Sequence, residues 1–494
     1  MKTAARLLRC FVQLAVPAAV LSGCANLAPD YRQPAAPIPQ SWPSGSAAVP
    51  VAASADLPAT EWQDFFMDAR LRRVVALAVA NNRDLRMAAL NIERARALYG
   101  IEQAAIFPGL RAGASGIRAR TSSGQSEGGS SRVSSQYSVN LGLASYELDL
   151  FGRVRNLSEA ALQTYFRAAE TRRSAQISLV AEVATAWLTL AADGQRLQLA
   201  RNTLASQRKS FELVERSHAL GAQSGLALAQ AQSTVDAARV EVAAFDAQVE
   251  RDGNALALLV GADVPAELLP PQGDNERAVQ LAPATRLLAP PAGLPSSVLQ
   301  QRPDVRAAEH ALRSGNADIG AARAAFYPSI SLTGSVGTAS STLAGLFGSG
   351  SRTWGFSPQI TLPIFDGGAN RANLRVTEVQ QNILLADYEK TLQIAFREVA
   401  DALALRRTLA ERLDAQQSLV ASTSRSFELS QALFRSGSGG FLEVLVAQRS
   451  LYAVQQSLID LQAVEQVNRL TLYKVLGGGW SEAKLATPSM GAGG

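Results

Sequence analysis

Two cysteines and two histidines are the side chains of this sequence best suited to chemistry, and their positions limit what that chemistry could be. His218 and His310 lie far apart, the cysteines are not paired at metal-binding spacing, and no glycine-rich phosphate loop ending in Gly-Lys occurs. Catalysis and a metal centre therefore have little support. We expect a protein that is not an enzyme and has no metal site and no cofactor except a covalent lipid.

The one reactive position with a clear context is Cys24. A basic start and a short apolar stretch lead into Leu21-Ser22-Gly23-Cys24. This resembles a bacterial lipobox, which implies that residues 1–23 are a signal peptide and that Cys24 is lipidated. A chance Gly-Cys after an ordinary signal peptide is the alternative. Ala25 stands where lipoproteins retained in the inner membrane usually carry aspartate, so the outer membrane is favoured.

Charge and composition argue against a nucleic-acid partner. The formal charge of +5 falls to about +2 once the basic signal peptide is removed. Lysine and arginine are spread among acidic residues, as on solvated helix faces, and form no phosphate-binding patch. Only 6% of the residues are aromatic, which suits extended helices better than one thick core.

The sequence contains an internal duplication. Arg83-Asp84-Leu85 and Pro303-Asp304-Val305 open equivalent helical runs, and Ser210-Phe211-Glu212-Leu213 recurs as Ser426-Phe427-Glu428-Leu429. Each half is predicted to run helix, strand pair, very long helix, turn, helix. Both aspartates fall in a first helical turn, where capping explains them fully.

This pattern predicts six segments. Prolines keep the segment after Cys24 extended, as in a tether, and Trp62 marks the start of folded sequence. The predicted segments are a signal peptide 1–23, a lipidated Pro/Ala-rich tether 24–60, a first repeat 61–270, a Pro-rich linker 271–300, a second repeat 301–480 and a flexible tail 481–494.

The strand pairs are amphipathic. Apolar residues alternate with Ser, Thr and Gln after Tyr327-Pro328 and from Trp354 to Ile364, and a similar alternation surrounds Val139. Gly/Ser-rich stretches at 121–131 and 338–352 are typical of hairpin loops. A soluble sheet with one wet face is the alternative. No later segment has about twenty consecutive apolar residues, so any crossing of a membrane falls to strands.

Four strands leave two open edges, which a bilayer cannot satisfy with water. Closure then requires several copies, and three copies supply twelve strands, an even number within the range of outer-membrane barrels. We therefore expect a homotrimer.

The helices predict the remainder of the fold. Residues 370–435 contain no proline, so one helix on the order of 100 Å is expected. Leu392, Phe396, Val399 and Leu403 form a coiled-coil stripe, and alanine allows close helix approach. Glycines mark the two predicted hairpin tips: Gly221, Gly225, Gly437, Gly439 and Gly440.

These residues carry a resemblance over nearly the whole mature chain. Leu27-Ala28-Pro29-Asp30-Tyr31, Gln301-Arg302-Pro303-Asp304-Val305, Phe441-Leu442-Glu443-Val444-Leu445 and Leu476-Gly477-Gly478-Gly479-Trp480 are similar to TolC-type outer membrane factors, with the NodT branch of lipoproteins as the best match. The resemblance implies a mainly α fold with a membrane β-barrel: a homotrimeric twelve-stranded barrel, four strands per chain, continued by a long α-helical coiled-coil barrel across the periplasm.

The resemblance also implies a gate just after the second hairpin turn, where Glu443 matches an acidic family position. Three copies would form a carboxylate ring that favours cations. A second acidic position of the family is Val446 here, which suggests a more apolar constriction with Leu442. The alternative for Glu443 is a solvated residue in a first helical turn.

The function so implied is a passive outer membrane duct of a tripartite efflux system, lipid-anchored, in contact with outer membrane lipid and extending into the periplasm. Its partners would be a periplasmic adaptor and an inner-membrane pump, often of the resistance-nodulation-division type, and its cargo small molecules such as drugs. Type I protein secretion, metal export and a structural coiled-coil lipoprotein without a pore remain alternatives. A periplasmic adaptor lipoprotein should lack the duplicated strand-helix unit.

Overall fold

The computed structural model describes residues 25–42, 61–121, 132–271 and 296–478. The predicted lipidation site Cys24 and the signal peptide lie outside the described residues. So do part of the tether, most of the first predicted hairpin loop, most of the linker and the predicted tail.

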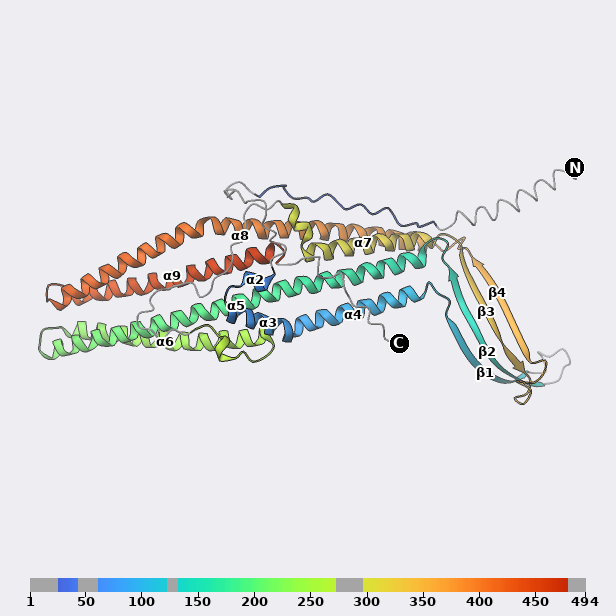
Figure 1. Cartoon of the computed structure of the whole chain (residues 1–494), viewed down its shortest axis with the longest axis horizontal. Helices are drawn as coiled ribbons and strands as arrows, with labels where there is room; N and C mark the ends of the chain where they lie inside the picture. Colours follow the sequence, from blue (N-terminus) through green and yellow to red (C-terminus); the bar gives the residue numbers. More distant parts are fainter. Residues whose placement is uncertain (1–24, 43–60, 122–131, 272–295, 479–494) are drawn as a thin grey trace. The chain divides into compact units, whose positions relative to one another are not determined.

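The order of elements confirms the duplicated pattern (Figure 1). The first half contains α2 (Trp62–Phe65), α3 (Ala69–Asn81), α4 (Arg83–Ala104), β1 (Leu110–Thr121), β2 (Arg132–Leu148), α5 (Arg153–Ala219), α6 (Gly225–Val260) and the 3-10 turn η3 (Ala266–Leu268). The second half contains the 3-10 turn η4 (Ser296–Gln301), α7 (Pro303–Ala324), β3 (Ser329–Ser340), β4 (Arg352–Thr361), α8 (Ala369–Arg435) and α9 (Phe441–Val475).

Contacts divide the chain into two compact units, and each unit takes segments from both halves of the duplication. Unit 1 holds all four strands with the helical residues beside them: 25–35, 91–169 and 307–389. Unit 2 holds both helical hairpins: 36–42, 61–90, 170–271, 296–306 and 390–478. The predicted segment boundaries follow the sequence repeats and stay predictions.

The two longest helices, α5 and α8, have 67 residues each and contain no proline. In α8 the predicted stripe is confirmed, since Leu392 and Val399 are fully buried. Within the described residues α5 also contains an 18-residue apolar stretch, of which more than half is buried inside the protein. That burial is typical of a core helix.

The core of unit 2 forms around aromatic residues. Phe65 stacks on Tyr473 with ring centroids 4.2 Å apart, and the indole Nε1 of Trp187 donates to the carbonyl of Leu268 at 3.0 Å. Phe65, Phe66 and Trp187 are all completely or almost completely buried. The short helices α2 and α3 therefore pack their apolar residues onto α5, α6 and α9.

In unit 1, the proline-rich segment that begins at Ala25 is extended and packed against helices from its first described residues. Asn156 Nδ2 donates to Asn26 Oδ1 at 2.9 Å, and Asn316 Nδ2 donates to the Pro29 carbonyl at 2.7 Å. Further along, the Tyr31 hydroxyl donates to Glu309 at 3.2 Å. Side-chain amides thus satisfy backbone and polar groups that an extended chain leaves unpaired.

The four strands form one antiparallel sheet in the order β1-β2-β3-β4. A bulge between Leu143 and Tyr146 places Ser145 at a φ of 51°. The alternating pattern extends to Ile364, but β4 ends at Thr361 because Pro363 cannot donate to the ladder. Pro358 lies inside β4, which pairs only with β3 among the described residues of this chain.

Candidate functional site

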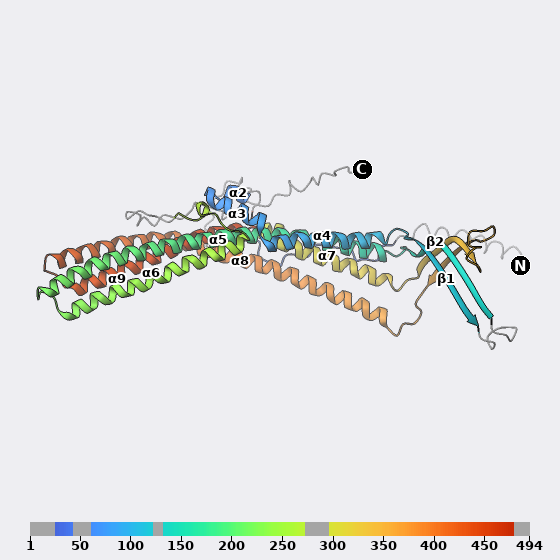
Figure 2. The ribbon, with the colours of Figure 1, turned by 90° about the horizontal axis from the view of Figure 1, so that it is seen from below.

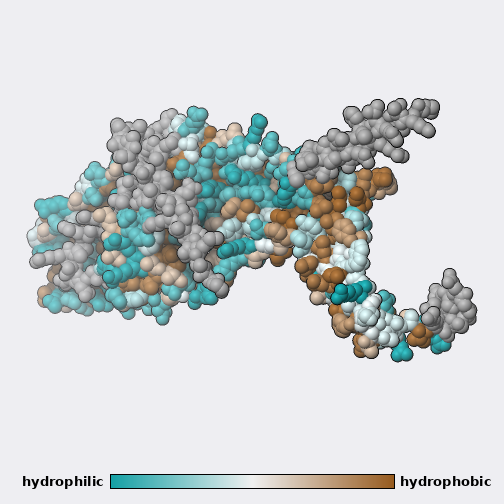
Figure 3. Space-filling view, turned by 45° about the vertical axis from the view of Figure 1, so that its right-hand side comes forward, coloured by the Kyte–Doolittle hydropathy of each residue, from teal (hydrophilic) through white to brown (hydrophobic). Residues whose placement is uncertain are grey.

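The sheet of unit 1 has one apolar and one polar face, and the strand register fixes which residues share each. Ala112 pairs with Leu141, Leu141 with Val336, and Val336 with Trp354, so these side chains lie on the same face. Figure 3 shows apolar side chains gathered over the sheet and hydrophilic ones over the helices. Trp354 is 82% exposed, which in an aqueous protein would be costly for so large an apolar side chain.

The opposite face of the sheet is hydrophilic. Asn140 pairs with Gly337 and Gly113, and Ser335 pairs with Gly142 and Gly355. Most side chains on this face are polar or small, including Ser115, Ser138 and Ser357. The alternation predicts water on this side and hydrocarbon on the other.

The outer strands β1 and β4 each pair on one side only among the described residues. Each therefore presents a row of backbone N–H and C=O groups that no described strand of this chain pairs. Lipid offers such groups no hydrogen bonds, so an amphipathic sheet of this kind needs neighbouring copies to complete it.

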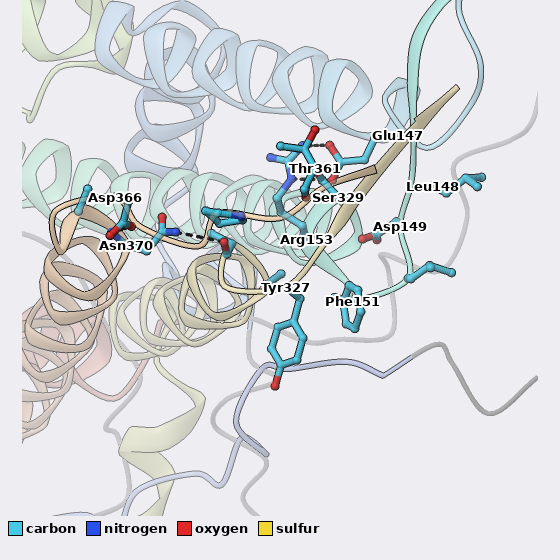
Figure 4. A pocket seen from close by; sticks show the side chains of 15 residues that line it. Glu147, Leu148, Asp149, Phe151, Arg153, Tyr327, Ser329, Thr361, Asp366 and Asn370 are labelled. Atoms are coloured by element: carbon cyan, nitrogen blue, oxygen red, sulfur yellow. Dashed lines mark hydrogen bonds and ion pairs between the residues drawn. The ribbon is translucent and has the colours of Figure 1, made fainter. Parts of the chain in front are cut away.

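A pocket of about 450 Å³ marks the joint where strands meet helices in unit 1 (Figure 4). Arg153 at the start of α5 binds Glu147 at the end of β2 through two contacts, 2.8 and 2.5 Å long. Phe151 stacks on Tyr327 with ring centroids 4.7 Å apart. The corresponding joint of the second half has Asp366, whose carboxylate accepts from the backbone N–H groups of Gly368 and Asn370, both at 2.8 Å.

Glycines make the turn at this joint possible. Gly152, Gly367 and Gly368 have φ values of 76°, 65° and 92°, which side chains with a Cβ rarely adopt. The chain therefore turns sharply after Phe151 and after Phe365. Backbone hydrogen bonds lower the pKa of Asp366, so this carboxylate stays charged and holds the first turn of α8.

The turns of the two helical hairpins lie side by side in unit 2 (Figure 2). Phe434 and Phe441 contact each other across the second turn with centroids 5.3 Å apart. The packed residues of both hairpins are Val214, Ala227, Ala231, Phe441, Val444 and Leu445, with Phe211, Leu228, Phe427 and Phe434 around them.

The predicted tip glycines have different roles in these turns. Gly221 and Gly437 occupy equivalent positions of the repeat, with φ values of 73° and 77°. Gly439 lies tight against Leu433, where an added Cβ would come within 3.0 Å. Gly225 and Gly440 have open space around them, and Gly440 is the N-cap of α9.

The three predicted gate residues share one exposed face of α9. Leu442 is 59% and Val446 56% exposed, and Glu443 is exposed as well, whereas Val444 and Leu445 are buried against the neighbouring hairpin. Because Val444 and Leu445 pack against the neighbouring hairpin, the opposite face of α9 is turned outward. In this chain the three side chains can therefore form one surface of an acidic group flanked by two apolar ones.

A carboxyl pair inside unit 2 was not predicted from the sequence. Asp193 on α5 is buried and lies beside Asp252 on α6, while Arg196 binds both Asp193 and Asp460 on α9. Burial, followed by the hydrogen bond and charge of Asp193, raises the pKa of Asp252 to about 6. Gln248 and Arg251 oppose this shift only partly.

The raised pKa predicts a pH-dependent stability. The folded state binds the proton of Asp252 more tightly than the unfolded state, so its stability falls as pH rises from about 4 to about 6 and stays lower above that. Asp252→Asn should match the wild-type unfolding temperature near pH 4 and exceed it by on the order of 2 °C at pH 8. Thermal unfolding followed by circular dichroism measures this difference.

The control is Asp246→Asn, also on α6, whose partner Arg201 lies 3.0 Å away at the surface. This variant should show no gain at pH 8. An equal rise in unfolding temperature in both variants would contradict the raised pKa of Asp252 beside Asp193. So would a rise for Asp252→Asn that is the same at both pH values.

The two histidines have ordinary structural partners. His218 Nδ1 lies 2.8 Å from the Gln223 carbonyl, and His310 Nδ1 lies 2.7 Å from Gln163 Oε1. In the described part of the chain no cluster of three metal-ligating residues occurs.

Comparison with known proteins gives a consistent result. A model of the family described as outer membrane efflux protein matches residues 74–262 and 294–478. The antibiotic efflux pump outer membrane protein ArpC and the toluene efflux pump outer membrane protein TtgC, both of Pseudomonas putida, are each 45% identical over 473 residues, which cover 95% of this chain and 96% of theirs.

Solved structures agree. The open-state crystal structure of the Neisseria gonorrhoeae MtrE outer membrane channel aligns with a TM-score of 0.81 at 38% identity, over 92% of this chain and 98% of that one.

Proposed function

Since the chain belongs to the outer membrane efflux protein family and is a non-enzymatic outer membrane channel that extends into the periplasm, we propose that it exports small toxic molecules supplied by an inner-membrane pump. Members of this family act as trimers together with adaptor and inner-membrane pump partners. The observation that carries the proposal is the amphipathic four-stranded sheet with two open edges, joined to duplicated helical hairpins.

Closure of the sheet follows from these edges. Three copies bring β4 of one chain beside β1 of the next, which pairs the remaining backbone groups and gives twelve strands. The polar face with Asn140 and Ser335 then lines the water-filled bore, and the face with Trp354 meets lipid. The chain itself has no energy source in this scheme, so the pump must provide it.

The cargo class follows from the relatives. ArpC and TtgC belong to pumps named for antibiotic and toluene efflux, so we propose apolar and amphipathic small molecules and a pump of the resistance-nodulation-division type. Type I protein secretion and metal export are the competing cargo classes. A deletion strain should become several-fold more susceptible to antibiotics and solvents and keep its resistance to copper and silver.

If the susceptibility profile of this deletion strain matches that of a strain lacking one inner-membrane pump, that pump is identified as the partner. Unchanged drug and solvent susceptibility in a strain that lacks every redundant duct would contradict this cargo class. Loss of a secreted protein, or selective metal sensitivity, would favour the competing classes.

Glu443, Leu442 and Val446 are proposed to form the constriction at the periplasmic end. Three copies of Glu443 around the axis would attract cations, and the flanking apolar side chains would limit the passage of water and ions. Glu443→Gln should lower the cation-over-anion permeability of purified trimers in planar bilayers several-fold.

The matched control is Glu250→Gln, which removes an exposed glutamate from α6 and should leave selectivity unchanged. If Glu443→Gln conducts with the wild-type selectivity, Glu443 does not belong to the constriction.

We also propose that Cys24 is lipidated. Docking of the chain from Asn26 onward supports this, because it would hold the lipid beside the joint at Gly152.

A further inference from the structure

Three arginines lie on the apolar face of the sheet, all at its loop end. Arg118 and Arg120 follow Ala112, Ala114 and Gly116 along β1 with the period of two that defines one face. Arg352 pairs with Thr338, one step beyond the apolar pair Trp354 and Val336.

The charged residues on this face of the sheet are all positive. The described residues of the apolar face include no aspartate or glutamate and no arginine other than these three. All three side chains are exposed, and neither Arg118 nor Arg352 forms a salt bridge with any residue that the structure describes. The other end of the face, around Leu110 and Ile360, is purely apolar.

The position of the arginines matches the upper limit of a membrane. From Ile360 to Trp354 the strand extends about 20 Å along its own axis, which at the tilt of about 40° found in such barrels covers about 15 Å of the apolar band, itself about 25 Å tall. Trp354 lies at the end of this band, where aromatic side chains mark a lipid-water interface. Arg352 therefore lies at head-group depth.

The leaflet is also determined. The joint with the helices lies at the Ile360 end of the sheet, and the helices extend into the periplasm. The arginine end therefore faces the outer leaflet, whose glycolipids carry phosphate groups. Guanidinium groups bind phosphate through paired hydrogen bonds and tolerate the partly dehydrated interface better than lysine does.

All three arginines belong to the two edge strands. On the inner strands the equivalent positions are Ser135, Val133 and Thr338. Closure of the trimer brings β1 of one copy beside β4 of the next, so the arginines of two copies meet on the rim at each seam. This step rests on the trimeric duct proposed above.

We propose that Arg118 and Arg120 of one copy and Arg352 of the adjacent copy form a binding site for the phosphorylated head group of an outer-leaflet glycolipid. A trimer has three such sites. Bound lipid closes over the seam between two copies and stabilises the assembled barrel.

The test measures binding of bis-phosphorylated lipid A to purified trimers in detergent, by native mass spectrometry. We expect wild-type trimers to retain lipid A and to bind the chemically dephosphorylated lipid at least tenfold more weakly. The double variant Arg118→Gln/Arg352→Gln should lose about tenfold in lipid A affinity. Arg118→Lys/Arg352→Lys should retain part of it, because charge remains and the paired geometry is lost.

The matched control is Arg111→Gln on β1, whose position pairs with Gly142 on the polar face. It should bind lipid A like the wild type. Equal binding by the wild type and the double Gln variant would overturn the proposal, as would equal binding of dephosphorylated lipid. Displacement by millimolar inorganic phosphate would identify a free-anion site instead and also overturn it.

Size-exclusion chromatography and conductance separate this inference from the duct itself. A variant that stays trimeric and conducting but still binds lipid A contradicts only the lipid site, whereas a wild-type chain that is monomeric and does not conduct contradicts the duct.

Discussion

Arg302→Met is expected to destabilise the protein by about 2–4 kcal/mol, because it removes the cation at the centre of a buried ion network. Arg302 is 8% exposed and binds Asp304 at 2.7 and 3.0 Å, Glu398 at 2.9 Å and the Val475 carbonyl at 2.9 Å. Removing the guanidinium leaves two carboxylates and the last turn of α9 without their shared partner. Purified protein should unfold several degrees lower by circular dichroism.

Two variants sharpen this test. Arg397→Met removes an exposed arginine of α8 that lies 3.9 Å from Asp401, and it should cost no more than about 0.5 kcal/mol. The unfolding temperature of Arg302→Lys should lie between those of the wild type and Arg302→Met, because one ammonium group cannot bind three partners in this geometry. If Arg302→Met unfolds at the same temperature as the wild type, the network adds no net stability.

Gly320→Val should release the extended N-terminal segment from unit 1. A Cβ at Gly320 would lie 2.8 Å from Ala28 and 2.5 Å from the amide nitrogen of Asn156, which itself binds Asn26. Overpacking of this kind costs about 1–3 kcal/mol, and the segment can relieve it by leaving its site. Amide hydrogen exchange in residues 27–33 should accelerate by about tenfold or more.

Gly100→Val is the control, since a Cβ at Gly100 on α4 meets nothing within 4 Å. It should leave exchange in residues 27–33 unchanged. If the N-terminal segment of Gly320→Val exchanges at the wild-type rate, the segment at Ala28 has room for the added atoms and does not depend on the glycine. Loss of docking should also loosen the hold on the proposed lipid at Cys24.

Much of the architecture could be predicted from local patterns. A proline-free run long enough for α8, the glycines at 221 and 437, and the alternation around Trp354 each reflect a preference that acts over a few neighbouring residues. The duplication then linked these elements into a repeated order. The three gate residues came instead from the resemblance to the TolC-type family, and their role remains a proposal.

Other features involve residues that are distant in the sequence. Asp193 and Asp252 are ordinary aspartates on ordinary helices until α5 and α6 place them in contact. The motif around Pro303 suggested only a helix cap at Asp304, whereas its main contribution is Arg302, which reaches α8 and α9. No local pattern contains such pairings.

The sequence by itself thus determined the kinds of elements, their order and the faces that each must hide from water or offer to it, because backbone preference and hydrophobic periodicity are local. Only the tertiary structure decided which charges meet, where the N-terminal segment docks against Gly320, and that Arg118 and Arg352 share a face. These outcomes depend on strand register and helix packing, which are settled by contacts between segments far apart along the chain.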